Sequence, residues 1–388
     1  MKLGFKFIYI EKLPGFKAGA LNVALRNTST DAEIIAILDS DYIVSPQFLK
    51  LTTPYFQDTQ LGFLQTCPGF RKYDDNRFKK ACRIAQQTFY KVIMPSRHQG
   101  KSVMFGGTVG LLRKQALEII NGWDETCIGE DAELSLRLLE ANYNGHYVDI
   151  ELGWGLLPEN FIELKKQRRR WTIGGIHTFK RHVKNLLAWK DLKNKKGLSL
   201  RQRFHHISAY LQWFSAMWVT SFTLIIIVVI TSALFFQRPI PPLMADAQIM
   251  LTLAVIVLVW RIRFLWAVQV KLAVSLREAT DAILVLQALT IAQALACVKG
   301  IFSEKVTFER TNKFTNLTNN RISLFSNIIE LLIGSICALL ASASWFFFSD
   351  WQTATMFSIT FLWLSAPYFS FFQVHHWNND EPDPRNRA

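Results

Sequence analysis

Two acidic pairs and one arginine–tryptophan pair follow one another along this chain of 388 residues, and their side chains could act on one substrate. The Asp-Ser-Asp segment at 39–41 offers two carboxylates, and such oxygens hold Mg²⁺ or Mn²⁺ together with phosphate groups. The Glu-Asp pair at 130–131 could supply a general base for a hydroxyl group. The Gln-Arg-Arg-Arg-Trp segment at 167–171 could bind a diphosphate and stack on a sugar ring.

Asp39 and Asp41 directly follow the apolar run Ile-Ile-Ala-Ile-Leu at 34–38. A short continuous run of this kind is typical of a buried parallel strand, and open α/β sheets bind ligands at the carboxyl ends of such strands. An isolated Asp-x-Asp is more often a solvated turn. The preceding strand and the later motifs favour a site for Mg²⁺ or Mn²⁺ here.

Glu130 and Asp131 open a predicted helix over 131–141, with Leu134, Leu138 and Leu139 on one face. Acidic residues near a helix N-terminus stabilise the helix by ~0.3–1 kcal/mol, which would explain the pair without catalysis. A general base would explain it equally well, and one residue could do both. The spacing alone leaves the two interpretations open.

Arg170 could engage a diphosphate with two hydrogen bonds, and the Trp171 indole could stack against a sugar. A basic helix at a membrane surface, anchored by a tryptophan, has the same pattern. Both interpretations stand on this segment alone.

The first part of the chain has the mixed composition of an α/β domain. We expect helices over 17–27 and 78–94, and further strands over 61–65 and 102–112. The five cysteines show no ligand spacing for zinc, which suits a reduced compartment.

The chain changes character near residue 205, where long apolar runs begin. The net charge of +14 is concentrated just before them, because 165–206 holds fourteen Lys and Arg and one acid, 14 − 1 = +13. A basic block before a span is the positive-inside pattern and attracts anionic lipids. We therefore expect a multi-pass protein of the cell membrane with a cytoplasmic α/β domain, and membrane lipids rather than nucleic acid as the partner of this block.

Four spans are expected, at about 209–236, 245–262, 324–348 and 353–373. The segment 264–302 is diluted by polar residues and is expected to form an interfacial helix. Six spans, with two contributed by this segment, are the alternative.

Six segments in order resemble the processive family-two glycosyltransferases with a GT-A domain, the group that holds bacterial cellulose synthase and related β-glycan synthases. The matching segments lie at 17–22, 39–41, 105–108, 122–123, 130–131 and 167–171. The segment at 308–313 resembles the family's cytosolic segment between spans, and the likeness runs from about residue 10 to 373. It implies a GT-A-like (Rossmann-like) cytosolic domain followed by an α-helical transmembrane domain.

The resemblance divides the chain into four parts. A partial GT-A domain occupies 1–160, a basic amphipathic interfacial segment 161–205, a transmembrane domain 206–373 and a polar cytosolic tail 374–388. It implies an inverting transfer of sugar from a nucleotide sugar, expected to be a UDP-sugar, to a growing β-linked polysaccharide, coupled to its translocation.

The resemblance also implies a role for each donor-side residue. Asp39 and Asp41 would hold Mg²⁺ or Mn²⁺ and the nucleotide diphosphate, with Asp41 as the main ligand. Lys17 would lie near the diphosphate. Asp131 would be the catalytic base, with Glu130 beside it.

On the acceptor side, the resemblance implies that Gln167 and Arg170 bind acceptor and diphosphate. Trp171 would form the platform for the acceptor sugar. Phe105 and Thr108 would lie on the acceptor side of the site.

Two departures from the family pattern stand out. Only about sixteen residues precede Lys17, too few for the family's nucleobase-binding strands, so we expect either a fragment or a chain without that half. Gly129 stands where cellulose synthases usually carry Thr. The alternatives are a non-processive transferase acting on a lipid-linked acceptor, and an inactive scaffold that partners accessory or full-length synthase subunits.

Overall fold

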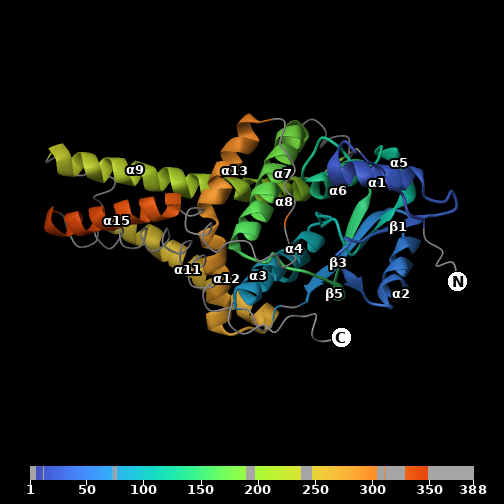
Figure 1. Ribbon diagram of the computed structural model, residues 1–388, viewed down its shortest axis with the longest axis horizontal. Coiled ribbons are helices and arrows are strands. Elements are labelled where there is room, and N and C mark those ends of the chain that lie inside the picture. Colours follow the sequence, from blue (N-terminus) through green and yellow to red (C-terminus); the bar gives the residue numbers. More distant parts are fainter. Residues whose placement is uncertain are drawn as a thin grey trace.

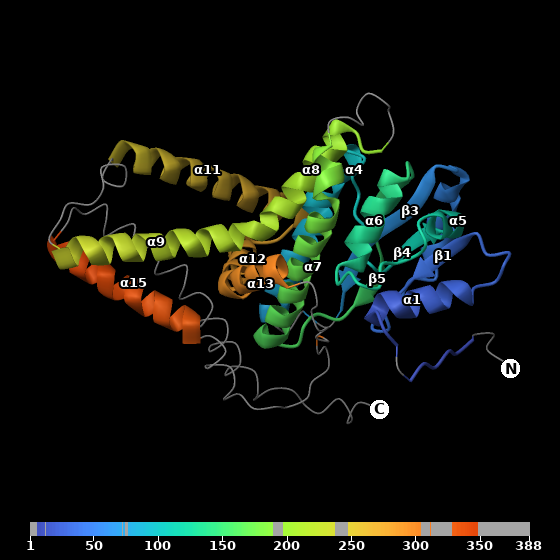
Figure 2. The same ribbon diagram turned by 90° about the horizontal axis from the view of Figure 1, so that it is seen from above.

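The computed structural model describes residues 6–11, 13–71, 73, 77–188, 197–236, 247–303, 311 and 328–347. An α/β part forms one end, and the long helices α9, α11 and α15 extend from the other (Figures 1 and 2). Helices α7, α8, α12 and α13 lie between the two ends. The change of composition near residue 205 therefore coincides with a change of architecture.

The α/β part is built on a five-stranded sheet in the order β1-β4-β3-β5-β2. Its strands are β1 (Ile34–Ile37), β2 (Ile43–Val44), β3 (Leu61–Phe70), β4 (Gly110–Arg113) and β5 (Asn144–Gly155). The central pair, β3 and β5, is parallel, and the other pairs are antiparallel. Every residue of β3 is buried, because helices cover both faces of the sheet at this strand.

Two strand predictions need correction. The run at 34–38 does form a strand, but β1 pairs only with β4 among the described residues, and it pairs antiparallel. It is thus a partly exposed edge strand, which an apolar run cannot distinguish from a central one. The strand expected over 102–112 is confined to β4, because Gly107 and Val109 have φ of 79° and 47° and interrupt extended backbone.

The predicted helices of this part are confirmed. They correspond to α1 (Phe16–Arg26), α6 (Glu130–Glu140) and α3 (Arg77–Thr88). A π-helical turn, Phe89–Ile93, joins α3 to α4 (Met94–Gln99), and the sheet edge carries α2 (Phe48–Thr52) and α5 (Lys114–Ile119). The three leucines expected on one face of α6 are at most 2% exposed.

The basic segment forms the 27-residue helix α7 (Phe161–Leu187), which begins where the Asn160 side chain accepts a hydrogen bond from the Glu163 N–H. It packs between α6 on the α/β side and α13 on the other (Figure 1). Part of its positive charge is paired within the chain, since Lys165 binds Glu330 at 2.7 Å and Arg181 binds Asp124. Its position at a membrane interface remains a prediction.

The apolar half consists of helices throughout its described residues. They are α8 (Leu200–Leu211), the turn Gln212–Phe214, α9 (Ser215–Phe236), α11 (Ala247–Leu272), α12 (Leu276–Ala288), α13 (Thr290–Phe302) and α15 (Ile328–Phe347). Helices therefore cover three of the four expected spans. The segment 264–302 supplies the end of α11 and two short helices rather than one interfacial helix.

Among the described residues, only Leu200–Phe236 is a single helix long and apolar enough to cross a membrane. The α12–α13 pair, bent by 42°, would be a second such element if it acts as one span. The structure thus does not confirm four spans. The expected span at 353–373 and the tail at 374–388 lie outside the described residues, as does the segment 308–313 apart from Thr311.

Two ion pairs join the α/β part to the apolar helices. Arg77 on α3 forms two hydrogen bonds of 2.7 and 2.6 Å with the Asp281 carboxylate on α12. Lys165 on α7 reaches Glu330 on α15, and both side chains are nearly buried. Charges on helices that are apolar elsewhere thus serve contacts inside the chain rather than contacts with solvent.

His182 on α7 lies between two carboxylates of α6, with Nε2 at 3.2 Å from Glu133 and Nδ1 at 3.2 Å from Glu140. Burial opposes its charge, but the hydrogen bonds to the two carboxylates outweigh that effect and raise its pKa to about 9. The contacts of charged His182 with the two carboxylates therefore stabilise the fold fully below pH 6.5, and this stabilisation is lost as the pH rises through 9. Its magnitude is on the order of 3 kcal/mol.

We expect the thermal midpoint of the wild type to fall between pH 6 and pH 9.5, and that of His182→Gln to change much less. Differential scanning fluorimetry in detergent measures both. His177→Gln is the matched control on the same helix, since His177 contacts the Ser303 carbonyl and, among the described residues, no carboxylate. An equal pH response in wild type and His182→Gln would contradict the charged bridge.

Candidate active site

The Lys17 ammonium joins three of the predicted site elements. Its Nζ lies 2.9 Å from Asp39 Oδ1, donates a 2.9 Å hydrogen bond to the Gly107 carbonyl and lies 4.0 Å from Asp131 Oδ2. Burial disfavours this charge, yet the carboxylates of Asp131 and Asp39 raise the pKa of Lys17 above its ordinary value. A permanent cation therefore stands between the two acidic motifs.

The loop from Phe105 to Val109 brings the backbone against these carboxylates. Gly107 has φ of 79°, and a Cβ at this position would overlap the Asp131 carboxylate. The Gln65 side chain on β3 holds the loop, accepting from the Gly106 N–H at 2.7 Å and donating to the Thr108 carbonyl at 3.0 Å. Only glycine fits this close approach.

Asp39 and Asp41 follow β1, and each is held from a neighbouring strand segment. The Asp39 N–H donates to Thr108 Oγ1 at 3.0 Å, and Asp41 Oδ2 accepts from the Leu156 N–H, just beyond β5, at 3.0 Å. The Arg71 guanidinium also donates to the Asp41 carbonyl at 2.9 Å. Hydrogen bonds thus fix the backbone of both residues, while the Leu156 N–H holds the Asp41 carboxylate and Lys17 holds that of Asp39.

This donor set fits Mg²⁺ or Mn²⁺ bound jointly with a substrate. In the described part of the chain, no three His, Cys, Asp or Glu side chains gather into a metal-binding cluster of their own. Two carboxylates completed by phosphate oxygens are the usual arrangement for these ions at nucleotide sites. The ion would then be held by Asp39, Asp41 and a diphosphate.

Glu130 and Asp131 occupy the first turn of α6; Glu130 is buried, and the Asp131 side chain is 25% exposed. Burial raises the pKa of Asp131 above its ordinary value, with Lys17 opposing the shift, and burial together with the Asp131 charge raises the pKa of Glu130. Asp131 Oδ1 is buried without a hydrogen-bond partner. A carboxylate with a free oxygen and a raised pKa has the properties of a general base.

Gly129 allows α6 to touch α7 backbone to backbone. A Cβ on Gly129 would lie 3.1 Å from the Gly174 backbone, and one on Gly174 would lie 2.9 Å from Gly129. A threonine at this position, which cellulose synthases usually carry, would require α7 to move away by a few tenths of an ångström. The glycine at position 129 therefore suits the close approach of α6 to α7. This approach brings the 167–171 segment close to Asp131.

The residues of 167–171 point in different directions from α7. Arg170 faces the acids: burial lowers its pKa, while the charges of Glu130 and Asp131 favour its protonated form. Gln167 is buried and accepts a hydrogen bond from Gln86 on α3 at 3.4 Å. Trp171 is 36% exposed.

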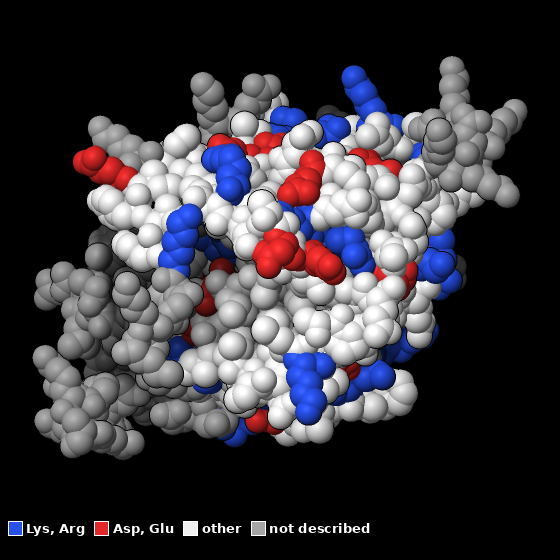
Figure 3. Space-filling view, turned by 90° about the vertical axis from the view of Figure 1, so that its right-hand side faces the viewer, with Lys and Arg blue, Asp and Glu red and all other residues white. Residues whose placement is uncertain are grey.

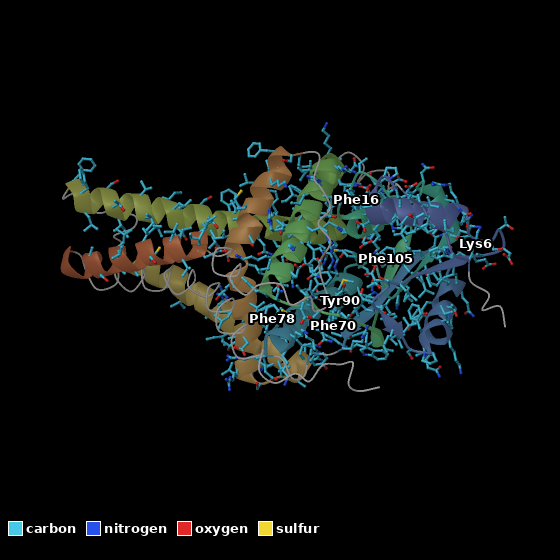
Figure 4. The ribbon with its side chains drawn as sticks, viewed as in Figure 1. Lys6, Phe16, Phe70, Phe78, Tyr90 and Phe105 are labelled. Atoms are coloured by element: carbon cyan, nitrogen blue, oxygen red, sulfur yellow. The ribbon has the colours of Figure 1, made fainter. Side chains whose placement is uncertain are left out.

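Phe105 and Thr108 lie deeper than the acceptor-side role requires. The Phe105 ring is 2% exposed and packs edge-on against Phe63 in the core, deep in the α/β part (Figure 4). Thr108 is 5% exposed and orients Asp39. If this segment contacts an acceptor, the Gly106–Gly107 backbone makes the contact rather than the Phe105 ring.

Sequence reasoning missed two residues that position the site, Gln65 and Asn22. Asn22 on α1 donates to the Trp123 carbonyl and accepts from the Trp123 N–H, both at 2.8 Å, which ties the helix of Lys17 to the loop before α6. A signal existed for both, because Asn22 closes the 17–22 motif and Gln65 is the polar residue at the end of the predicted strand 61–65.

Charges of both signs are interspersed over the end of the α/β part that faces away from the long helices (Figure 3). Lys and Arg side chains alternate there with Asp and Glu side chains. The acidic and basic side chains of the site itself are held together by the contacts around Lys17.

Comparison with known proteins places the chain in a family. The model of the family described as glycosyl transferase family group 2 matches residues 34–372. The UDP-forming catalytic subunit of cellulose synthase 1 from Komagataeibacter xylinus is 32% identical over 208 residues, which is 52% of this chain and 26% of that protein. A UDP-forming cellulose synthase from Dictyostelium discoideum is 31% identical over 193 residues, 48% of this chain and 17% of that protein.

A probable glucomannan 4-β-mannosyltransferase 4 of Oryza sativa subsp. japonica is 27% identical over 213 residues, 54% of this chain and 38% of that protein. Among solved structures, the mannosyltransferase PcManGT from Pyrobaculum calidifontis in complex with GDP-Man and Mn²⁺ superposes with a TM-score of 0.44 at 15% identity, over 74% of this chain and 66% of that one. The match spans about a quarter or less of the cellulose synthases. Because the family model covers most of its length, the chain belongs to glycosyl transferase family group 2, with cellulose synthases among its relatives.

Proposed function

We propose that the chain transfers a sugar, with inversion, from a UDP-sugar to the end of a growing β-linked polysaccharide at the cell membrane. The observation that carries the proposal is the position of Lys17, in contact with Asp39 and the Gly107 carbonyl and 4.0 Å from Asp131. The carboxylate assigned to the metal and the carboxylate assigned as the base thus both lie within 4.0 Å of one cation. Such a set suits a reaction in which a diphosphate departs while a hydroxyl loses its proton.

We assign donor binding to four residues, Asp39, Asp41, Lys17 and Arg170. Mg²⁺ or Mn²⁺, when bound, would offset negative charge on the diphosphate as a Lewis acid. The two cationic side chains orient the same group by charge-assisted hydrogen bonds.

Asp131 then acts on the acceptor. Its carboxylate takes the proton from the attacking hydroxyl as the new bond forms to the anomeric carbon, and the bond to the nucleotide diphosphate breaks. Displacement from the opposite side converts an α-linked donor into a β linkage. Trp171, exposed beside this centre, would support the acceptor sugar.

The apolar helices support an acceptor that extends into the membrane. Leu200–Phe236 is long enough to cross it, and α7 connects that helix to the site. A polymer platform directly beside a spanning helix favours polysaccharide extension and translocation over single additions to a lipid. Product length separates the two functions, since only the former yields a polymer.

The first test is UDP binding by calorimetry on the detergent-purified chain, with and without Mn²⁺. We expect Mn²⁺ to strengthen binding at least tenfold, and Asp41→Asn to remove that gain while leaving the weaker metal-free binding unchanged. Asp31→Asn, on an exposed loop, is the control and should bind as the wild type does. Metal-independent affinity in the wild type would refute the assigned role of Asp39 and Asp41.

A further inference from the structure

Arg168 stacks on the indole of Trp171, one helical turn away on α7. Its Cζ lies 4.7 Å from the centroid of the ring. Its Nε is buried and makes no hydrogen bond, and no carboxylate of the described residues pairs with it. The contact with Trp171 is therefore the main polar compensation that the described structure offers this guanidinium.

A buried guanidinium without a carboxylate is unfavourable unless another group offsets its charge. Burial accordingly lowers the pKa of Arg168 to about 10. The face of an indole is the best aromatic partner for a cation, and a planar guanidinium can lie flat on it. In this contact the Arg168 guanidinium lies over one of the two faces of the Trp171 ring.

Two other side chains of the 167–171 segment make contacts away from Trp171. Gln167 is bonded to Gln86 on α3, and Arg170 faces Glu130 and Asp131. Among the described residues, Arg168 forms no ion pair with the acids and no hydrogen bond with α3; its charge acts on Cys82 of α3 and on Tyr90, and its direct side-chain contact is with the Trp171 ring. With one face of the ring covered and Trp171 still 36% exposed, the remaining surface is free for a ligand.

We propose that Arg168 is a positioning residue that holds the Trp171 indole in one orientation, so that its open face receives the terminal sugar of the acceptor. This inference rests on the proposed function. It assigns Arg168 to acceptor affinity and to the number of sugars added before release, and not to donor binding.

Two substitutions and a matched control test the stacking itself. Arg168→Lys keeps the charge but loses the planar group, Arg168→Gln loses both, and Arg169→Lys alters a neighbouring arginine that makes no contact with the Trp171 ring. Oxidation of Trp171 by N-bromosuccinimide, followed by mass spectrometry, should be at least threefold faster in both Arg168 variants and unchanged in Arg169→Lys. Equal rates in all four proteins would overturn the stacking.

The role is tested with UDP-glucose as donor and a β-1,4-linked glucose tetrasaccharide as acceptor. For Arg168→Lys we expect the KM for the tetrasaccharide to rise five- to tenfold and products to shorten, with the KM for UDP-glucose and the affinity for UDP unchanged. In a Trp171→Ala background the same substitution should have no further effect. An additive loss, or a loss in donor affinity, would overturn the positioning role.

The role of Arg168 and the proposed function are refuted by different outcomes. A wild type that elongates the tetrasaccharide, with Arg168→Lys elongating equally well, refutes the role of Arg168 and leaves the proposed function standing. A wild type that binds UDP with Mn²⁺ but neither binds the tetrasaccharide nor transfers glucose to it refutes the acceptor site and the role of Arg168 together.

Discussion

Replacing Asp131 by asparagine lowers the rate of sugar transfer by about 10²–10⁴-fold, the usual contribution of a general base, while UDP binding persists. Asparagine has the same shape but cannot accept the proton of the attacking hydroxyl. Asp131 lies 4.0 Å from Lys17 and takes no part in the contact between Lys17 and Asp39. The diphosphate side of the site should therefore remain assembled. Transfer rate and UDP affinity, measured on the same preparation, separate the two effects.

The pH dependence of the wild type tests the same assignment. A base must be deprotonated to act, so transfer is lost as the pH falls through its pKa in the enzyme. Burial raises that pKa, so the acidic limb should lie above the ~3.9 of an ordinary aspartate.

Glu118→Gln, an exposed acid on α5, serves as the control and should leave transfer unchanged. Full activity in Asp131→Asn would eliminate Asp131 as the base and leave Glu130 as the remaining acid of the pair. Glu130→Gln would then be the variant that loses transfer.

Replacing Gly107 by alanine is expected to lower transfer by at least 10²-fold. The substitution places a methyl group in the position of the Asp131 carboxylate and strains a backbone with φ of 79°. Either the carboxylate or the loop must move, and the loop also carries the carbonyl that accepts from Lys17. Misplacement of a base by 1 Å is costly on this scale.

Gly197→Ala provides a closely matched control, because Gly197 has φ of 80° but no atom within 4 Å of an added Cβ. It measures the backbone strain alone, which should lower the thermal midpoint slightly and leave transfer intact. Transfer rates and melting temperatures of the two variants side by side isolate the steric effect. Wild-type activity in Gly107→Ala would show that Asp131 does not lie against this loop during catalysis.

Local elements could be read from the sequence with good accuracy. Helices α1 and α6 end within one residue of their predicted limits, because the periodicity of their apolar residues and the glycines before them are local signals. The extent of the strand at 102–112 could not be read in this way. Left-handed backbone at Val109, a β-branched residue, is imposed by the loop around Gly107 and not by local propensity.

The apolar half of the chain shows the same division. Apolar composition alone predicted helices at 209–236, 245–262 and 324–348, and α9, α11 and α15 lie there. Composition did not predict the break between α12 and α13, or the ion pair from Lys165 to Glu330. Both depend on which helices become neighbours.

The residues alone indicate the kinds of chemistry available: carboxylates after a strand, an acid pair at a helix start and an arginine–tryptophan motif on a basic helix. Folding adds the contact of Lys17 with Asp39 and the Gly107 loop, the approach of two helices at Gly129 and Gly174, and the position of Arg168 over Trp171. These contacts could not be predicted because residue type and local periodicity are properties of short segments. The contacts at Lys17 and between the two glycines join segments far apart in the chain. Arg168 and Trp171 lie on one helix, but their surroundings depend on the elements against which α7 packs.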